Sequence, residues 1–323
     1  MSTVRRPRKG SLQYSPRKRS KRQYGRIRAW AGIQEPKLLG FAGYKVGMAH
    51  AIIADNKKTS MTKGQDIFCP LTIVECPPIK TASIRFYKNT EYGLKLVSEV
   101  FAGNLDKELG RKITLPKKIK NKIDDISEFD DITLLVYTQP KLTRIGKKKP
   151  ELFEIAVGGS KEQKLNYAKE KLGNEISVSE VFAEGQLLDV HAVTKGKGFQ
   201  GPVKRFGIGL KAHKSEKGRR APGSLGAWMG QQHFMWKVAH AGRMGYNLRT
   251  EHNKWLLKIG AKAEDINTNG GFLSYGDVKS HYVLIKGSVP GPKKRLIRFN
   301  FPIRPDRRIP NEAPTIQYLS VRD

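Results

Sequence analysis

The clearest candidate chemistry in this 323-residue sequence lies in a glycine-rich hexapeptide, GKGFQG, at residues 196–201. Its spacing is formally G-x-G-x-x-G, which binds the pyrophosphate of a dinucleotide when it joins a strand to a helix. A strand is expected just before it, but Pro202, Gly207 and Gly209 follow and prevent a helix of useful length. Glu216, the nearest acid downstream, lies in HKSEKGRR rather than at the end of a second strand. The hexapeptide therefore does not predict a nucleotide cofactor.

A second interpretation of the same residues is contact with a polymer of phosphates. Glycine lets a backbone approach its partner closely, and Lys195, Lys197, Lys204 and Arg205 could neutralise phosphate charge. The alternative is that the glycines only shape a tight turn. Both interpretations can hold together, and the surrounding cations favour contact with RNA.

Residues suited to catalysis do not occur in a convincing context. We find no Ser/His/Asp arrangement, nucleophile elbow, paired carboxylates or phosphate-binding loop of the NTPase type. The basic segments are nearly free of acids, which removes general bases and magnesium ligands from where an RNA substrate would lie. The histidines lack the spacing of a zinc protease, and Cys69 and Cys76 predict reduced, buried thiols. We therefore expect no enzyme activity, no metal and no cofactor.

The distribution of charge is more informative than the net value of +32. Residues 1–34 hold 11 Lys and Arg and no acid, and residues 190–262 hold 15 bases and 2 acids. Residues 91–189 hold 17 charges of each sign. Two basic segments on a neutral scaffold are typical of a protein that binds nucleic acid.

Membranes and secretion are less favoured destinations. No basic amphipathic helix with a bulky apolar face is present, and no apolar run approaches the ~18 residues of a membrane span. The N-terminus lacks the apolar core of a secretory signal, and Pro7, Gly10, Pro16 and Gly25 would interrupt the helix of a mitochondrial transit peptide. We expect a cytoplasmic protein without a membrane partner or a small-molecule substrate.

The basic segments need a scaffold, and the sequence predicts one made of short strands. Runs rich in Val, Ile, Leu and Phe are bounded by Pro, Gly or Asn at the spacing of an antiparallel barrel. The predicted strands lie within residues 38–54, 68–76, 81–89, 94–102, 185–194, 253–260, 281–289 and 295–301. The chain is thus expected to be mainly β.

Residues 104–175 differ from this pattern and predict an inserted α+β subdomain. The strand-like runs DITLLVYTQP and ELFEIAVGGS precede a helical run, KEQKLNYAKEKLG. Ser160 with Gln163 predicts a capping box at its start, and Gly173 predicts its end. The expected organisation is a basic arm at 1–34, a barrel body at 35–103 and 176–323, the insertion at 104–175, and a central extension at 196–254.

The stretch at residues 201–231 holds 7 Gly, 7 Lys or Arg and one acid, with five residues among Val, Ile, Leu and Phe. A long loop of this kind is uncommon unless it is functional, and we expect it to order only on RNA. Trp228, flanked by glycines, could be a local core anchor or could stack on a splayed base. His233, Trp236 and His240 have helical spacing and are expected to pack on one face of a short helix.

At residues 182–205 the sequence resembles the large-subunit ribosomal protein three family, the L-three family. The resemblance continues through GAWMGQQHFMWKVAHAGRMGYNLRTEHN, SHYVLIKGSVPGPKKRLI and the N-terminal GSLQYSPRKRSKR, so it spans nearly the whole chain. Length and the basic N-terminus are similar to the archaeal or eukaryotic branch rather than the shorter bacterial one. The positions that match the family pattern are Phe182, Asp189, Ala192, Thr194, Gly196, Lys197, Gly198, Gly201 and Arg205.

The resemblance implies a six-stranded closed β-barrel of the translation-protein type with an inserted α+β subdomain. It also implies a structural constituent of the large ribosomal subunit that binds large-subunit rRNA early in assembly, contacts neighbouring ribosomal proteins and supports the peptidyl transferase region. Trp228 occupies the position of a family tryptophan near the tip of the central extension, which favours its RNA-facing interpretation. The eukaryotic branch has a histidine twelve residues earlier, where this chain has Glu216, so no histidine modification is expected there.

Charge and resemblance together define the residues expected to bind RNA. The alternative class of function is a basic RNA-modifying or nucleotide-dependent enzyme built on a similar barrel. The expected RNA-binding residues are Arg5, Arg6, Arg8, Lys9, Arg17, Lys18, Arg19, Lys21, Arg22, Lys195, Lys197, Lys204, Arg205, Lys211, Lys214, Arg219, Arg220, Trp228, Lys237, Arg243 and Arg249.

Overall fold

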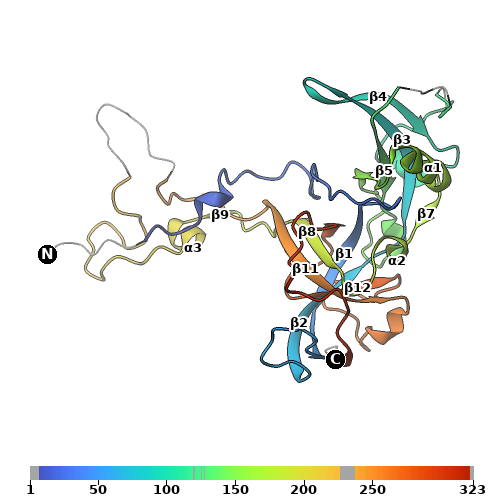
Figure 1. The fold of residues 1–323 in the computed structure, drawn as a ribbon. Helices are drawn as coiled ribbons and strands as arrows, with labels where there is room; N and C mark the ends of the chain where they lie inside the picture. The colour runs from blue at the N-terminus through green and yellow to red at the C-terminus, as the bar shows by residue number, and fades with distance from the viewer. Residues whose placement is uncertain (1–6, 119–120, 125, 127, 226–236, 321–323) are drawn as a thin grey trace. The chain divides into compact units, whose positions relative to one another are not determined.

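A computed structural model describes most of the chain, and its contacts divide the chain into two compact bodies (Figure 1). We name the first, Met1–Arg22 with Val193–Leu248, the arm–extension body. The second, Gln23–Ala192 with Arg249–Asp323, is the main body. The described residues are 7–118, 121–124, 126, 128–225 and 237–320.

The main body is built on a ring of hydrogen-bonded strands. In pairing order the ring runs β13, β8, β11, β12, β2 and β1, and β1 pairs again with β13. A further strand, β14, pairs with the second half of β1. The prediction of a mainly β chain is confirmed. The bounds are β1 Gly40–Ala54, β2 Asp66–Glu75, β8 Leu187–Val193, β11 Leu248–Gly260, β12 Tyr282–Lys286, β13 Leu296–Asn300 and β14 Ile316–Ser320.

The long strand β1 pairs with three strands. β2 pairs along most of one edge of β1, and the other edge pairs with β13 in its first half and with β14 in its second half. Its first residues, Gly40 to Tyr44, pair antiparallel with β13, and His50 to Ile53 pair with β14. A Cβ at Gly43 would lie 2.6 Å from Cys76 Sγ, so only glycine allows β2 to approach this closely. The sequence did not predict β14, because its five residues carry too little apolar pattern to stand out.

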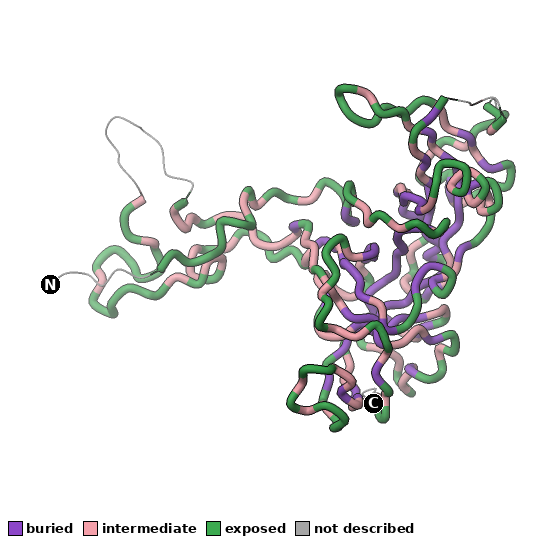
Figure 2. The backbone as a smooth tube through the Cα atoms, in the orientation of Figure 1, coloured by how far each residue is buried: buried purple, intermediate pink, exposed green. Residues whose placement is uncertain are grey.

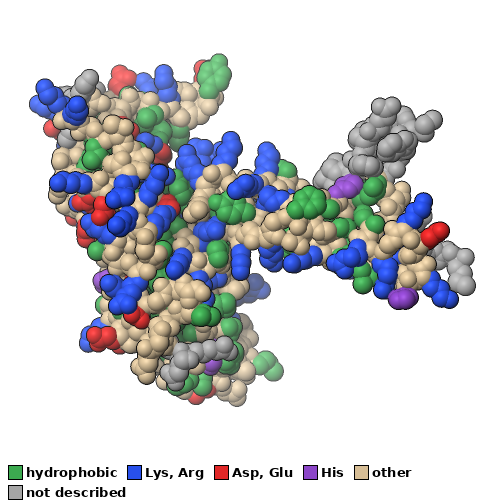
Figure 3. All heavy atoms as spheres, turned by 180° about the vertical axis from the view of Figure 1, so that it is seen from behind, with side chains coloured by type: hydrophobic (Ala, Val, Ile, Leu, Met, Phe, Trp, Pro, Cys, Tyr) green, Lys and Arg blue, Asp and Glu red, His purple; other side chains and the backbone are tan. Residues whose placement is uncertain are grey.

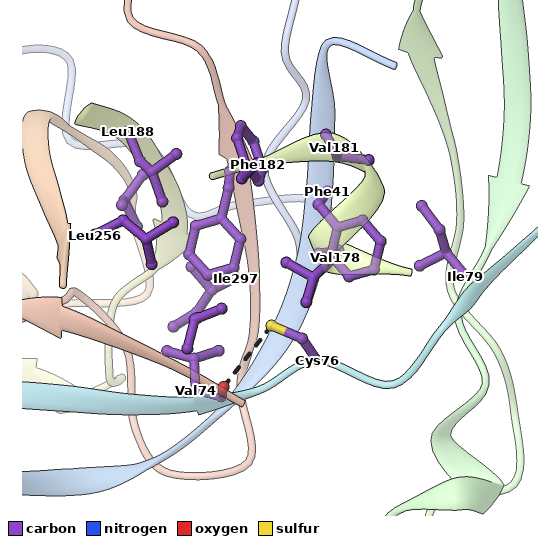
Figure 4. Packing of buried hydrophobic residues seen from close by; sticks show 14 of the residues in the cluster. Phe41, Val74, Cys76, Ile79, Val178, Val181, Phe182, Leu188, Leu256 and Ile297 are labelled. Carbon is purple, nitrogen blue, oxygen red and sulfur yellow. Dashed lines mark hydrogen bonds between the residues drawn. The ribbon is translucent and has the colours of Figure 1, made fainter. Parts of the chain in front are cut away.

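Large apolar side chains from opposite strands of the ring meet in one core (Figure 4). Phe41, Leu188, Leu256 and Ile297 are each at most 1% exposed, and burial of such a side chain contributes about 1.5–3 kcal/mol. The short helix α2, Val178–Val181, adds two apolar side chains to the same core. Cys69 and Cys76 are free and buried, so the prediction of buried thiols is confirmed.

A second sheet has the order β4, β3, β5 and β6, with β7 paired to β3. The runs now seen as β3 and β4 were expected among the barrel strands, and that assignment is wrong. A tight turn at Glu91-Tyr92 folds β4 back on one edge of β3, and the other edge of β3 pairs with β5 rather than with a strand of the ring. The bounds are β3 Ile79–Thr90, β4 Gly93–Phe101, β5 Asp131–Tyr137, β6 Leu152–Ala156 and β7 Glu175–Ile176, with single helical turns η2 Lys107–Arg111, η3 Pro140–Leu142 and η4 Ala263–Asp265 elsewhere in the main body.

The predicted helix of the α+β region is present as α1, Lys161–Lys171. Its capping box is also confirmed, because Ser160 Oγ accepts from Gln163 N and Gln163 Oε1 accepts from Ser160 N at 3.0 Å. Gly173 follows with a φ of +77°, which suits the left-handed end of a helix.

The end of the predicted arm packs on the main body rather than staying apart from it. Tyr24 is 7% exposed, and its hydroxyl donates to Leu152 O at 2.7 Å. Arg298, 2% exposed, donates to Gly25 O at 2.9 Å and to Glu154 O at 2.7 Å. Burial lowers the pKa of this guanidinium. A buried cation needs hydrogen-bond acceptors. The backbone carbonyl of Gly25, in the predicted arm, is one of the acceptors of Arg298.

The arm–extension body has little secondary structure and almost no core. Figure 2 shows exposed and half-buried positions along it, whereas buried positions run through the main body. Of its described residues, Val193 and Asn247 alone are buried. The elements are η1 Leu12–Tyr14, β9 Phe199–Gln200, α3 Pro202–Phe206 and β10 Gly242–Arg243.

Candidate RNA interface

The arm–extension body concentrates positive charge. It holds 20 Lys and Arg and a single acid, Glu216, whereas the main body holds 41 bases and 28 acids. In Figure 3 Lys and Arg side chains recur along its visible face, with very little acidic surface. A surface of this sign attracts phosphate and repels other cations.

Most predicted RNA-binding cations of this body have exposed side chains. Exposure leaves each ammonium or guanidinium able to reach a phosphate from solvent. The exposed members of the prediction are Arg8, Lys9, Lys18, Arg19, Lys21, Arg22, Lys195, Lys197, Lys204, Lys211, Lys214, Arg219, Arg220 and Lys237.

Several predicted arginines bind the chain's own backbone, namely Arg8, Arg17, Arg205, Arg219 and Arg243. Arg243 donates through Nη2 to Asn247 Oδ1 at 2.8 Å and also bonds Arg17 O and Gly245 O. Arg205 donates through Nε to Arg243 O at 3.1 Å and through Nη1 to His240 O at 2.8 Å. Hydrogen bonds to a charged group contribute about 1.5–3 kcal/mol each. Arg243 therefore joins the extension to the arm, whereas the hydrogen bonds of Arg205 link two parts of the extension.

Burial, with a smaller contribution from nearby Arg243, lowers the pKa of Arg205. Arg243 thus places a second positive charge beside the partly buried guanidinium of Arg205. A phosphate close to Arg205 and Arg243 would relieve that repulsion.

Two guanidinium groups also contact one aromatic ring in this body. Arg17 lies 4.6 Å and Arg205 lies 5.0 Å from the centroid of Phe206, distances at which a cation is attracted to a ring. Beside them is a cavity of about 520 Å³, large enough for a small planar group. Its lining residues are Ser15, Pro16, Arg17, Arg205, Phe206, Val238 and His240.

The glycine-rich hexapeptide forms one side of a short β-ribbon rather than a cofactor loop. Lys197 N donates to Met244 O at 3.0 Å, and Met244 N donates to Gly198 O at 2.9 Å. The helix that follows, α3, has five residues and ends at Gly207, whose φ is +68°. The prediction that no helix of useful length follows is therefore confirmed.

The N-terminal arm lies along the extension through backbone and ring contacts. Ser20 N donates to Tyr246 O at 2.9 Å, and Arg19 lies 5.4 Å from the Tyr246 ring centroid. Gly245 is needed beside them, because a Cβ at its φ of +74° would lie 2.0 Å from Lys195 O. Segments more than 200 residues apart in sequence thereby form one basic surface.

The remaining predicted residues have different surroundings. Arg249 is half-buried on β11 in the main body. Arg5, Arg6 and Trp228 lie outside the described residues, as do His233 and Trp236 of the expected short helix. The described partner of that pair, His240, lies in irregular structure.

Sequence reasoning missed Phe199 as a candidate contact residue. Its side chain is 77% exposed on β9 between exposed lysines and glycines. An aromatic residue near glycines in a basic segment could have predicted a contact residue. The glycine spacing was instead interpreted as a feature of the backbone.

Comparison with known proteins shows which family the chain matches over nearly its whole length. A sequence profile of the family described as Ribosomal protein L3 matches residues 1–319. The chain belongs to the ribosomal protein L3 family. The family prediction made from residues 182–205 is thus confirmed.

Archaeal relatives agree with the family profile. The protein named large ribosomal subunit protein uL3 from Methanobrevibacter smithii is 50% identical, over 98% of this chain and 97% of its own length. The protein of that name from Archaeoglobus fulgidus is 49% identical, over 94% and 93%. The one from Methanocaldococcus jannaschii is 48% identical, over 98% and 97%.

The described residues also bear on metal sites and on membrane-spanning helices. Among the described residues, no group of three or more His, Cys, Asp or Glu side chains is arranged to hold a metal ion. No helix in the described part of the chain has the length and apolar character needed to cross a bilayer.

Proposed function

We propose that this chain is a structural constituent of the large ribosomal subunit in cytoplasmic ribosomes. It binds large-subunit rRNA and neighbouring ribosomal proteins and performs no chemical step. The observation that carries the proposal is a body with 20 bases, one acid and almost no core in a chain of the ribosomal protein L3 family. Such a body has nothing to bury against itself and a strong attraction for phosphate.

The exposed cations of the arm–extension body are the proposed phosphate ligands, and Arg205 and Arg243 set their spacing. Bonds from these arginines to backbone carbonyls leave their positive charge in place. One network therefore orders the chain and keeps its surface attractive to RNA. Arg249 is proposed to add a contact from the main body, and Arg5, Arg6 and Trp228 complete the predicted set.

We further propose that the ring of strands is a closed barrel of the translation-protein type. Support comes from the pairing order, which returns to β13 after six strands. The inserted α+β subdomain is then the sheet from β3 to β7 with α1, and residues 196–254 are the central extension. Residues 1–22 act as the basic arm.

The stoichiometry of the purified subunit tests the structural role. A constituent should co-sediment at one copy for each large subunit and stay bound after washing in moderate salt. A basic RNA-modifying or nucleotide-dependent enzyme should be present in far less than one copy and should be released. Quantitative mass spectrometry against other subunit proteins distinguishes the two outcomes.

We also propose that the central extension supports the peptidyl transferase region and that the chain joins rRNA early in assembly. Trp228→Ala should leave subunit assembly largely intact but alter peptidyl transfer or sensitivity to antibiotics that bind there. The reason is that truncation at a glycine-flanked tryptophan removes stacking area and little core. A variant chain that fails to fold would instead identify Trp228 as a core residue.

A further inference from the structure

Phe199 is exposed without a structural reason in its own chain. Its side chain is 77% exposed, and it belongs to neither apolar core cluster of the described residues. Burial of a phenylalanine side chain stabilises a fold, so this ring leaves that stabilisation unused in the free chain. A single exposed apolar side chain is ordinary; the surroundings of this one are not.

Glycines on both sides leave the ring open to a partner. A Cβ built at Gly198 or at Gly201 would have no heavy atom within 4 Å. Gly201 also has an ordinary φ of −68°, which any residue can adopt. Neither backbone conformation nor internal packing therefore requires glycine at position 201. Close approach of another molecule would require it.

The ribbon around Phe199 is held in place and carries positive charge. Gln200 Nε2 donates to Lys197 O at 2.6 Å, and Phe199 lies opposite Arg243 in the pairing of β9 with β10. Lys195 and Lys197 are both exposed on the same loop. An exposed apolar ring that follows two exposed lysines on one loop matches a planar base attached to a charged backbone.

We propose that Phe199 is a stacking platform for an unpaired base of rRNA. Gly198 and Gly201 leave room for the attached sugar and phosphate, and Lys195 and Lys197 neutralise the adjacent phosphates. The inference deepens the proposed function and rests on it.

An unpaired base fits this site better than other partners. Bases in an A-form duplex are stacked on each other and present no free face to an aromatic ring. Every single-stranded base has such a face, whatever its identity. An apolar protein partner on this ring would also have to cover the exposed lysines nearby, which costs free energy without a compensating charge.

Binding of the full-length chain to large-subunit rRNA tests the platform through four variants. Phe199→Ala should weaken binding about tenfold, the order expected when a stacking ring is removed. Phe199→Leu should weaken it similarly because it keeps bulk but no ring, whereas Phe199→Tyr should bind as the wild type does. Phe68→Ala is the matched control, since Phe68 is 66% exposed on β2, and should change nothing.

Two further readouts separate stacking from charge. The slope of log affinity against log salt should be unchanged in Phe199→Ala, because no phosphate contact is lost. Ultraviolet cross-linking of the wild-type complex, followed by trypsin and mass spectrometry, should find a nucleotide adduct at Phe199 in the peptide of residues 198–204. Gly201→Ala should weaken binding while the free chain unfolds as the wild type does.

The platform is overturned if Phe199→Leu binds like the wild type, if Phe68→Ala loses as much affinity as Phe199→Ala, or if the cross-linked peptide carries no nucleotide. In each of these cases the wild-type chain still binds rRNA, so the proposed function stands. Loss of the proposed function would look different, because the wild-type chain would then bind rRNA no more tightly than an unrelated protein of equal charge.

Discussion

Buried apolar side chains stabilise the main body, whereas arginine bonds to backbone carbonyls stabilise the arm–extension body. Phe41, Leu188 and Ile297 of the main body have no counterpart in the arm–extension body, where Val193 and Asn247 are the buried members of the described residues. In the arm–extension body, hydrogen bonds from Arg205 and Arg243 order the chain where an apolar core is lacking. The two bodies thus use different physical sources of order within one chain.

The difference explains how a ribosomal chain can be ordered and strongly cationic at once. An apolar core adds no charge to the protein, but each arginine that joins a hydrogen-bond network adds a cation. The 20 bases of the arm–extension body therefore repel one another until an anion is near. Its order in the free chain should be weaker than that of the main body.

The largest expected effect is on the core of the main body. Phe299 is 1% exposed, so Phe299→Ala should lower the free energy of unfolding of the free chain by about 3–5 kcal/mol. Phe199→Ala should change it by less than about 0.5 kcal/mol, because the ring is exposed. Urea unfolding followed by circular dichroism measures both. Equal changes in the free energy of unfolding at the two positions would contradict the idea that only the main body is stabilised by an apolar core.

Salt dependence provides the next test. Removing residues 1–22 deletes nine Lys and Arg and leaves Tyr24 in the main body. The log–log salt slope for rRNA binding should fall by about three to six, since each neutralised phosphate contributes about 0.7–0.9. Replacing Lys117, Lys118 and Lys122, which are exposed in the charge-balanced region, should leave the slope unchanged. An unchanged slope after truncation would mean that the arm does not touch phosphate.

Limited proteolysis compares the two bodies directly. Free chain should be cut early in the extension, where the trypsin sites are exposed, and the same sites should be protected in assembled subunits. Lys45, Lys80 and Arg298 in the main body are buried and should resist cleavage in both states. Resistance of the extension in the free chain would show that it needs no RNA to order. The sites expected to be cut are Lys211, Lys214, Lys217, Arg219 and Arg220.

The smallest expected effect is a pH dependence in the main body. His191 bonds Thr250 Oγ1 at 2.9 Å and Asn300 Oδ1 at 2.6 Å, and its pKa is lowered, mainly by burial. The unfolded chain therefore binds a proton below about pH 6.5 that the folded chain binds only at lower pH. Stability should fall as the pH drops through this interval.

His191→Gln removes that proton and is the matched variant. Its free energy of unfolding should change less between pH 7 and pH 5.5 than that of the wild type, in chemical unfolding at both values. Equal changes in the two proteins would show that other groups cause the acid sensitivity.

Local features of the fold were predictable, and long-range pairing was not. Strand runs and the Ser160–Gln163 capping box follow from residue patterns a few positions long. The membership of β3 and β4 in the second sheet depends on partners more than 30 residues away, such as Leu135 opposite Ser83. Composition does not encode that choice.

The candidate site also had features that were predictable from the sequence and features that were not. Charge counting identified the cations, because their number per segment is visible in the sequence. It did not separate Arg205 and Arg243, which bind the chain itself, from exposed lysines, since that distinction requires knowing which carbonyls lie nearby. Exposure of Phe199 was hidden for the same reason.

The bond from Arg243 to Arg17 O joins residues separated by 226 positions, and this has a consequence in time. Synthesis proceeds at about 5–20 residues per second, so the arm is made about 11–45 s before Arg243 exists to hold it. The related contacts of Arg8 with Lys237 and of Ser20 with Tyr246 come just as late. During that interval the first 22 residues are a bare polycation next to the ribosome that is making them. We therefore expect the arm to gain these backbone contacts only after the extension has been synthesised.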